Sequence, residues 1–129
     1  ESLYPEFSAA MARHGAEIFS NVTNDAWFGQ TFEPYQHMTM TLARALENRR
    51  PLLRSTNTGI STVILADGTV LERSPLGKEW VGMYKVPFQK NPPITTYSRI
   101  AGFSPWFSGI LVLLVLGISF WANRRRSPL

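Results

Sequence analysis

Apolar residues in the first fifty positions recur at the spacing of amphipathic helices. In residues 4–14 the apolar side chains that share one helix face are Phe7, Ala10 and Met11. In residues 34–50 the corresponding stripe consists of Met38, Leu42, Ala45 and Leu46. Pro51 ends the second pattern, because proline cannot continue a helix. The sequence therefore predicts two helices, with Arg44 and Glu47 together on the solvent side of the second.

Shorter apolar stretches between and after these helices have the character of strands. They are residues 17–22, 52–55, 60–65, 69–72 and 79–86. The turn signals between them are Asn57-Thr58-Gly59 and Asp67-Gly68, and each predicts a hairpin connection. The order of strand, helix, strand and hairpin indicates an α/β or α+β layered domain. Because so few strands cannot cover both helices, we expect the rest of the sheet to lie upstream of this chain.

The C-terminal part of the chain contains one long uncharged segment, residues 101–123. A helix of 23 residues reaches roughly 34 Å at about 1.5 Å per residue, which spans a hydrocarbon core of about 30 Å. Residues 110–118 are apolar on every helical face, and aromatic pairs stand at both ends of the segment. The pattern predicts a membrane-spanning helix, and the alternative is a buried helix of a soluble domain.

The charges beside this segment predict its orientation. Three arginines at 124–126 follow it directly, so the positive-inside rule places the C-terminus in the cytoplasm and residues 1–100 outside. Residues 87–100 contain three prolines and no periodicity, which is typical of a linker. The expected organisation is a globular part at 1–86, a linker at 87–100, a transmembrane helix at 101–123 and a basic cytoplasmic tail at 124–129.

Composition excludes several classes of protein. The 129 residues contain no cysteine, which excludes disulfide scaffolds, cysteine-ligated zinc and a thiol nucleophile within this chain. The net charge is +4, and the three tail arginines supply most of it, which argues against nucleic acid as a partner. His14 and His37 lie 23 positions apart, so we expect no metal site, and nothing in the sequence indicates a cofactor.

The most unusual polar stretch is residues 21–29, Asn-Val-Thr-Asn-Asp-Ala-Trp-Phe-Gly. It follows a strand with the pattern of a buried one, and ligands of α/β proteins bind beyond the carboxyl ends of strands. Its residues predict either a ligand site or a hydrogen-bonded turn with Trp27 in the core. For residues 57–59 a plain turn is favoured, and for residues 47–50 a structural role at the helix end.

Three blocks of the sequence resemble the bacterial apolipoprotein N-acyltransferases, which are membrane members of the nitrilase superfamily. The blocks are residues 21–29, Arg-Ala-Leu-Glu-Asn-Arg-Arg-Pro at 44–51 and Arg-Ser-Thr-Asn-Thr-Gly-Ile-Ser at 54–61. The resemblance extends over nearly all of the chain, including Asp67-Gly68 and the C-terminal apolar segment. Asn-Asp-Ala-Trp-Phe-Gly and Arg-Pro-Leu-Leu-Arg-Ser-Thr-Asn are specific to the acyltransferase group, whereas Arg-Ala-x-Glu-Asn alone indicates the wider superfamily.

The resemblance implies an α/β fold, the C-terminal part of a nitrilase-like αββα sandwich followed by one transmembrane helix. The sandwich is expected on the periplasmic side of the bacterial inner membrane. The implied reaction transfers an acyl chain from a phospholipid to the α-amino group of the N-terminal diacylglyceryl-cysteine of an apolipoprotein. The family's mechanism is ping-pong: a cysteine forms a thioester, a glutamate acts as general base and a lysine stabilises the oxyanion.

The family's motif around the nucleophile is only partly present here. The family has Cys-Tyr-Glu, and Glu1 with the residues after it resembles the position directly following that cysteine and tyrosine. The resemblance implies a supporting catalytic role for Glu1, and substrate-binding roles for Asn24, Asp25 and Trp27, with Trp27 in the acyl pocket. The nucleophile, base and lysine are expected upstream, so we predict that this chain alone has no acyltransferase activity.

Two other interpretations remain open. One is a membrane-anchored carbon–nitrogen hydrolase of the same superfamily, which would release ammonia from an amide. The other is a non-catalytic, tail-anchored interaction module, which requires a self-contained fold. The Asn-Asp-Ala-Trp-Phe-Gly block argues against the first interpretation, and the low number of predicted strands argues against the second.

Overall fold

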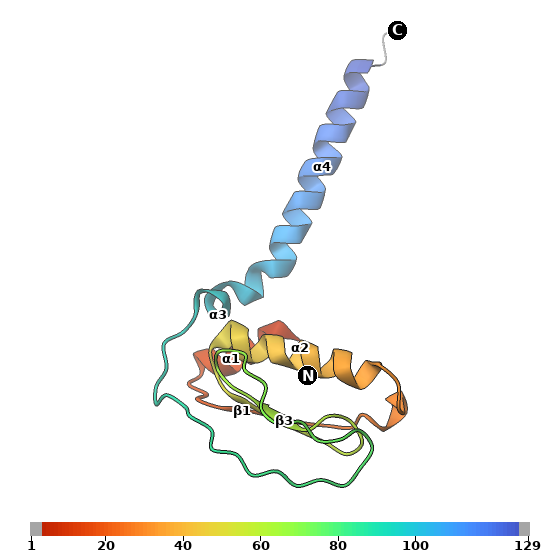
Figure 1. The fold of residues 1–129 in the computed structure, drawn as a ribbon. Helices are drawn as coiled ribbons and strands as arrows, with labels where there is room; N and C mark the ends of the chain where they lie inside the picture. The colour runs from red at the N-terminus through yellow and green to blue at the C-terminus, as the bar shows by residue number, and fades with distance from the viewer. Residues whose placement is uncertain (1–3, 127–129) are drawn as a thin grey trace. The chain divides into compact units, whose positions relative to one another are not determined.

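A computed structural model describes the backbone of residues 4–126 and the side chains of residues 4–103 and 106–121. The chain divides into two units, Glu1–Arg99 and Ile100–Leu129, and Figure 1 shows the elements of both. Glu1, which the resemblance assigns to the catalytic cluster, lies outside the described residues. The fold of the first unit therefore positions the remaining predicted site residues.

The first unit is built on a three-stranded sheet with the order β1-β2-β3. Strand β1 (Phe19–Thr23) pairs in parallel with β2 (Leu52–Thr56), and β2 pairs antiparallel with β3 (Thr62–Ile64). The predicted hairpin is thereby confirmed. Thr23 lies opposite Thr56 in the register, so β1 and β2 end at the same edge of the sheet.

Two helices cover one face of this sheet, as Figure 1 shows. Helix α1 (Pro5–Arg13) begins with proline, and helix α2 (Glu33–Asn48) carries the chain from the end of β1 back to the start of β2. Both predicted helices are confirmed. Arg49 follows α2 with a left-handed φ of 53°, a conformation that ends many helices. The core between helices and sheet consists of Ala12, Phe19, Ala45, Leu52 and Ile64.

Burial differs from the predicted helix faces in three places. Leu46, which belongs to the predicted apolar stripe of α2, is 37% exposed. In α1 the small residues Ser8, Ala9 and Ala12 are buried, whereas Phe7 is 50% exposed. In α2, Arg44 is buried, and its Nη2 donates to Glu47 Oε1 at 2.6 Å. The prediction that Arg44 and Glu47 face solvent together is wrong, because the ion pair lets both charges lie against the packed side of the helix.

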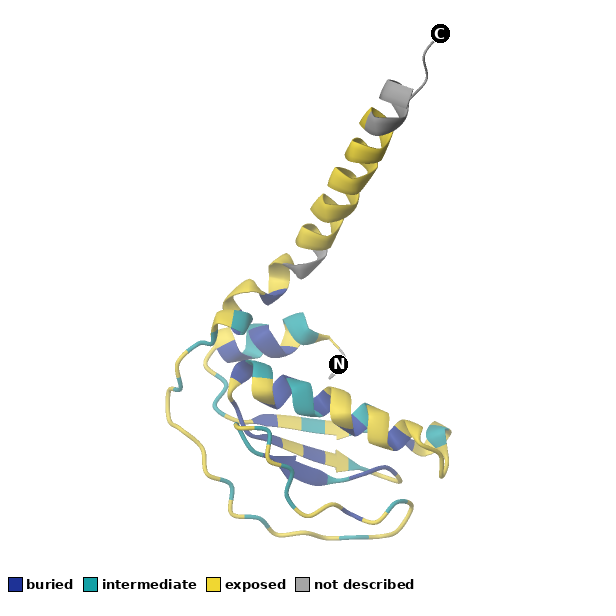
Figure 2. Ribbon diagram, turned by 45° about the horizontal axis from the view of Figure 1, so that its top comes forward, coloured by how far each residue is buried: buried dark blue, intermediate teal, exposed yellow. Residues whose placement is uncertain are grey.

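The opposite face of the sheet is exposed over β1 and β2, whereas over β3 Val63, which pairs with Leu53, is only 4% exposed. Side chains alternate across a strand, so the residues between the core positions point away from the helices. On β1 and β2 those residues are exposed, and they are Ser20, Val22, Leu53 and Ser55. Figure 2 shows the alternation of buried and less buried positions along these two strands. A groove separates this face from Trp80 and Tyr84 of the following segment.

The turn directly after β3 has the predicted geometry. Asp67 Oδ1 accepts the N–H of Thr69 at 2.9 Å, and Gly68 adopts a φ of 90°, which favours glycine. The expected return strand at 69–72 is reduced to a single bridge between Ile64 and Val70. The predicted tight turn is therefore confirmed, but the prediction of a strand after it is wrong.

Residues 79–86 form no strand, although their sequence alternates. Val81 and Met83 are 95% and 99% exposed, so neither packs against the sheet. Alternation describes a surface that fits a sheet, but a strand also needs a partner backbone. The prediction of a strand here is wrong for that reason.

Within the first unit, Arg50 holds the segment that follows residue 86 in place. This residue is 1% exposed, and its Nη1 and Nη2 donate to the carbonyls of Pro93 and Pro92 at 3.2 and 2.9 Å. Its Nε donates to the Ala16 carbonyl at 2.8 Å. Burial lowers the pKa of the Arg50 guanidinium. Within the residues interpreted as a linker, Thr96–Ile100 form helix α3.

The second unit consists of a short 3₁₀ turn, η2 (Ala101–Phe103), and a long helix, α4 (Ser104–Arg126). The helix covers most of the predicted segment 101–123. Within the described part of the chain, no single helix has the length and apolarity needed to cross a membrane, but a bent pair, Thr96–Phe103 with Trp106–Trp121, meets both requirements by length and composition. The position of this segment in a membrane is therefore a proposal.

Candidate functional site

The carboxyl ends of β1 and β2 carry the polar loops that the sequence singles out. The loop after β1 begins at Asn24, and the turn between β2 and β3 begins at Asn57. An open cleft at this edge is lined by Val22, Thr23, Asn24, Ser55, Thr56 and Asn57. Because α/β proteins bind ligands beyond the carboxyl ends of parallel strands, this edge is the candidate site.

Two asparagine side chains join these loops. Asn57 Nδ2 donates to Asn24 Oδ1 at 2.7 Å, and Asn57 Oδ1 accepts the backbone N–H of Asp25 at 3.0 Å. Asn24 Oδ1 also accepts the backbone N–H of Ala26 at 3.0 Å. The amide groups thus satisfy backbone N–H groups that no strand pairs, and they hold the two loops together.

The side chain of Asp25 forms a fully buried ion pair. Its Oδ2 lies 2.9 Å from Nη2 of Arg54 in β2, and both side chains are 0% exposed. Its Oδ1 lies 2.9 Å from Nδ1 of His37 in α2. Burial lowers the pKa of the Arg54 guanidinium, and the charge of Asp25 opposes that shift. Both oxygens of the Asp25 carboxylate therefore have partners.

Trp27 is an exposed aromatic residue of the loop after β1. It lies in the 3₁₀ turn η1 (Ala26–Phe28) and is 79% exposed. The next residue, Phe28, packs edge-on against His37, with ring centroids 5.8 Å apart and an interplanar angle of 76°. The interpretation that places Trp27 in the core is wrong for this structure, because the residue lies at the surface of the first unit.

The structure brings the predicted residues Asn24, Asp25 and Trp27 together in one loop, whereas Glu1 lies outside the described residues. Sequence reasoning missed Arg54 and His37, the two partners of the Asp25 carboxylate. One signal was available for Arg54: it occupies an inward position of β2, where alternation calls for an apolar residue. A charged residue at such a position indicates a buried partner.

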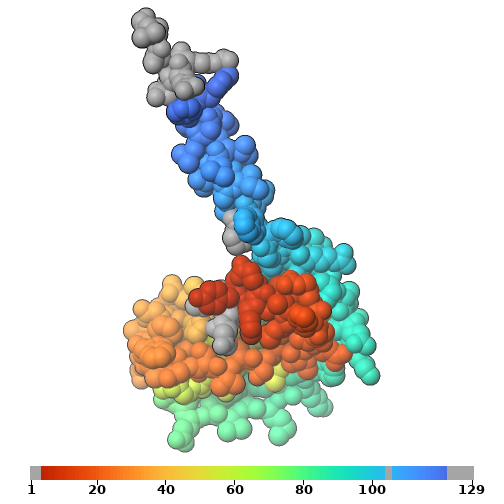
Figure 3. All heavy atoms as spheres, turned by 180° about the vertical axis from the view of Figure 1, so that it is seen from behind, coloured from red at the N-terminus to blue at the C-terminus, as the bar shows by residue number. Residues whose placement is uncertain are grey.

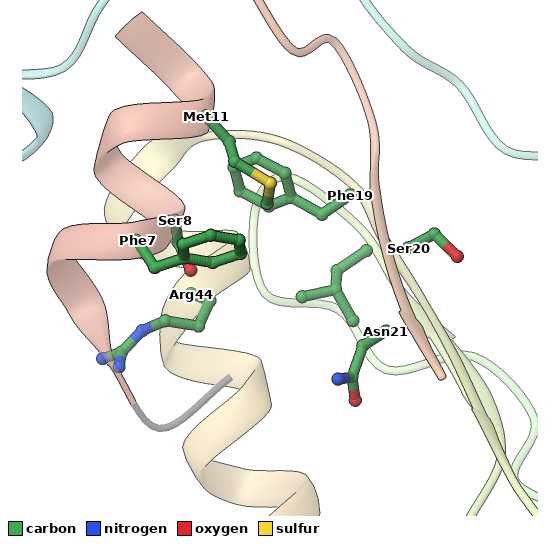
Figure 4. A pocket seen from close by; sticks show the side chains of 8 residues that line it. Phe7, Ser8, Met11, Phe19, Ser20, Asn21 and Arg44 are labelled. Atoms are coloured by element: carbon green, nitrogen blue, oxygen red, sulfur yellow. The ribbon is translucent and has the colours of Figure 1, made fainter. Parts of the chain in front are cut away.

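A second, smaller pocket lies between α1, β1 and α2. Figure 4 shows Phe7, Met11 and Phe19 pointing toward one another in it, with Asn21 and Arg44 at its polar side. Figure 3 shows α1 and β1, coloured red to orange, on one face of the first unit. Of the residues that the structure describes, none lines both this pocket and the cleft at the strand ends.

The chemistry available at the strand ends is hydrogen bonding. The cleft offers amide and hydroxyl groups, and the nearby Asp25 carboxylate is already engaged by Arg54. Among the side chains that the structure describes, no group of three or more His, Asp or Glu could hold a metal ion. Since the chain also contains no cysteine, this edge can bind and orient a ligand but supplies no thiol nucleophile.

The sequence that forms α1, α2 and the sheet matches a known family of proteins. Residues 1–90 match the family model of the carbon–nitrogen hydrolases, and the chain therefore belongs to the carbon–nitrogen hydrolase family. The membership agrees with the nitrilase superfamily to which the sequence motifs point.

Within that class, the chain is similar to the apolipoprotein N-acyltransferases. It is 56% identical over 117 residues to the one from Bdellovibrio bacteriovorus, a match that covers 91% of this chain and 21% of the relative. The identity is 38% over 130 residues with the relative from Ralstonia nicotianae, covering 98% of this chain and 24% of that protein. With the relative from Haemophilus influenzae it is 32% over 130 residues, covering 100% and 24%. The resemblance inferred from the motifs is confirmed, and the chain spans a quarter or less of the length of these relatives.

Proposed function

We propose that this chain is the C-terminal part of an apolipoprotein N-acyltransferase. The complete protein transfers an acyl chain from a phospholipid to the α-amino group of the N-terminal diacylglyceryl-cysteine of an apolipoprotein. The observation that carries the proposal is the similarity to proteins of that name over nearly the whole chain, 91% of it for the Bdellovibrio relative. The cleft at the strand ends supports it, because hydrogen-bonding groups line this cleft. The loop that contains Trp27 begins at the same edge of the sheet.

The proposed reaction has two steps through a thioester. A cysteine thiolate upstream of this chain attacks the ester carbonyl of the phospholipid, a C–S bond forms, and the lysophospholipid alkoxide leaves and takes up a proton. The amine of the apolipoprotein then attacks the thioester, an amide bond forms, and the thiolate leaves. The upstream glutamate accepts the amine proton, and the upstream lysine stabilises the oxyanion.

In this proposal the residues of the loop after β1 line the substrate side of the active site. Trp27, with its indole 79% exposed, offers an apolar wall to the acyl chain. Asn24 and Asp25 form the polar part of the same substrate-binding edge. Glu1 supports the nucleophile from the position directly after the family's Cys-Tyr.

The part of this sheet face that is exposed, over β1 and β2, is the proposed contact with the rest of the domain. Val22 and Leu53 expose apolar surface on this face, at 81% and 38%. In an αββα sandwich two sheets pack face to face, with helices on the outside. We assign the second sheet to this face, which leaves α1 and α2 as one outer helical layer.

Residues 101–123, which contain η2 and most of α4, are proposed to cross the bacterial inner membrane. The segment contains no charged residue, and Trp106 and Trp121 stand near its two ends. The arginines at 124–126 place the C-terminus in the cytoplasm by the positive-inside rule. Residues 1–86 and the linker at 87–100 are then periplasmic, on the side of the apolipoprotein substrate.

The first experiment is to sequence the reading frame upstream of Glu1 and to express the complete protein. We expect Cys-Tyr directly before Glu1, an acyl-thioester on that cysteine after incubation with phospholipid, and transfer to a diacylglyceryl-modified peptide. The 129-residue chain alone is the control, and it should form no thioester because it has no cysteine. A complete protein that contains the cysteine and transfers no acyl chain contradicts the proposal.

The second candidate function is that of a membrane-anchored carbon–nitrogen hydrolase. The match of residues 1–90 to that family favours it. The same preparation distinguishes the two activities, because hydrolysis releases ammonia from an amide and leaves the peptide amine unmodified. Ammonia release without acyl transfer would select the hydrolase. A reading frame with no nucleophile upstream would instead favour the non-catalytic interaction module.

A further inference from the structure

A buried side-chain network lies directly behind the proposed substrate loop. We infer that Arg54 and His37 are positioning residues, which act through the Asp25 carboxylate to fix the loop of Asn24 and Trp27 against the β2–β3 turn. The inference rests on the proposed function, in which that loop lines the acyl site. It also changes the role of Asp25 from contacting substrate to orienting its neighbours.

Arg54 is also held by β1, by α2 and by Ile60 in the connection between β2 and β3. Its Nη1 donates to Asn21 Oδ1 in β1 at 2.7 Å and to Thr41 Oγ1 in α2 at 2.9 Å. Its Nε donates to the carbonyl of Ile60, next to the β2–β3 turn, at 3.2 Å. The remaining Nη2 donates to Asp25 Oδ2. Because the planar guanidinium is fixed on its other nitrogens, the place of the Asp25 carboxylate is fixed as well.

His37 holds the second oxygen of the same carboxylate. A carboxylate oxygen accepts, so the Nδ1 atom 2.9 Å from Asp25 Oδ1 is the donor of this hydrogen bond. The ring of His37 also contacts Phe28, the neighbour of Trp27 in η1. The imidazole therefore contacts the loop at Asp25 and at Phe28, one residue on each side of the segment Ala26–Trp27.

The backbone of Asp25 connects this network to the edge of the cleft. Its N–H donates to Asn57 Oδ1 at 3.0 Å, and its carbonyl accepts the N–H of Phe28 at 3.1 Å. A shift of the carboxylate therefore changes both the contact with the β2–β3 turn and the start of the turn that presents Trp27. Buried polar groups with every partner in place specify one arrangement, which is what a substrate-lining loop requires.

Matched substitutions of His37 test this role. The amide nitrogen of asparagine takes the place of histidine Nδ1, so His37→Asn keeps a donor for Asp25, whereas the glutamine of His37→Gln reaches the place of Nε2. Thr39→Ala is the control, since it removes only the hydrogen bond of an exposed Thr39 hydroxyl to the Tyr35 carbonyl in the same helix.

The first readout is hydrogen exchange of the complete protein, followed at the amides of this region. His37→Gln should raise the exchange rates of the Asp25 and Phe28 amides about tenfold or more, while amides of β2 keep their protection. His37→Asn and Thr39→Ala should stay within about threefold of the parent. Unchanged exchange in His37→Gln, or equal loss in His37→Asn, overturns the inference.

The second readout is the kinetics of the complete enzyme. A substrate wall displaced by about 1 Å lowers kcat by roughly 10- to 100-fold, so His37→Gln should show that loss with the KM for the peptide changed less than about twofold. His37→Asn should restore kcat. A parent protein without acyl transfer contradicts the proposed function alone, because the exchange data still decide whether His37 fixes the loop.

Discussion

Gly59 lies directly against the carboxylate of Asp25. A Cβ atom placed on Gly59 would stand 2.7 Å from the carboxyl carbon of Asp25, a distance that real Cβ atoms essentially never show. The two residues belong to different loops at the carboxyl edge of the sheet, the β2–β3 turn and the loop after β1. The missing side chain at position 59 is therefore a steric requirement of the buried ion pair.

Replacing Gly59 by alanine should lower the free energy of unfolding by about 1–3 kcal/mol, because the added methyl group overlaps a carboxylate held by Arg54 and His37. Denaturant unfolding in mild detergent, followed by circular dichroism, measures the change. Gly102→Ala adds the same group with nothing within 4 Å, outside the α-helices, and should change the energy by less than about 0.5 kcal/mol. Equal stability of the two variants would mean that the carboxylate moves aside.

The Asp25–Arg54 pair should show strong coupling in a double-mutant cycle. Arg54→Met leaves a fully buried carboxylate without its cation, which we expect to cost about 3–5 kcal/mol of unfolding free energy. In the Asp25→Asn background the same substitution should cost about 2 kcal/mol less, since no buried charge is left unpaired. Arg73→Met, at an exposed position, should be additive with Asp25→Asn. Additive costs for Arg54→Met would contradict a direct interaction.

Arg50 should hold the segment that follows residue 86. Arg50→Lys removes the two guanidinium nitrogens that donate to the carbonyls of Pro92 and Pro93. We expect this substitution to lower the unfolding free energy by about 2–3 kcal/mol. Trypsin should then cut after Lys90, which is exposed, about tenfold faster than in the parent chain. The control is the same substitution at the neighbouring Arg49. Equal cleavage rates at Lys90 in both variants would show that the segment is held by other contacts.

Local patterns predicted the elements of the first unit but not all of the faces that they bury. The apolar stripe of α2 gave its position correctly, and Met38 and Ala45 are buried as that stripe requires. In α1 the prediction followed the large residues, whereas the buried positions are Ser8, Ala9 and Ala12. Periodicity weighs side chains by hydrophobicity, but close packing of a helix also selects small ones.

The loop of Asn24, Asp25 and Trp27 could be predicted from its polar residues after a strand, but the partners of Asp25 could not. Arg54 is 29 positions from Asp25 along the chain, and no local spacing connects them. The ion pair arises because parallel pairing of β1 and β2 brings the two segments together. Long-range pairing of this kind is a property of the fold, so sequence periodicity leaves it undetermined.

Asp67 should give the turn after β3 a dependence on pH. Hydrogen bonding from Thr69, first from its backbone N–H, lowers the pKa of the Asp67 carboxyl below its ordinary value of 3.8. Because the folded-state pKa is lowered, the stabilisation is fully present above the unfolded value and is lost as the pH falls through the folded one. The difference in unfolding free energy between the parent and Asp67→Asn should therefore shrink below pH 3.8. A difference independent of pH in that window would contradict the assignment.

Trp27 should matter for acyl transfer and little for folding. The side chain is 79% exposed in this chain, so Trp27→Ala should change the unfolding free energy by less than about 0.5 kcal/mol. In the complete enzyme the same substitution removes a wall of the proposed acyl site, and kcat/KM for the phospholipid should fall about tenfold or more, the loss expected when about 1.5 kcal/mol or more of apolar contact is removed. Trp27→Phe keeps an aromatic wall and should retain most of the activity. Phe32→Ala, which truncates another aromatic residue, 68% exposed, serves as the comparison. If Trp27→Ala transfers acyl chains as fast as the parent, the acyl pocket lies away from this loop.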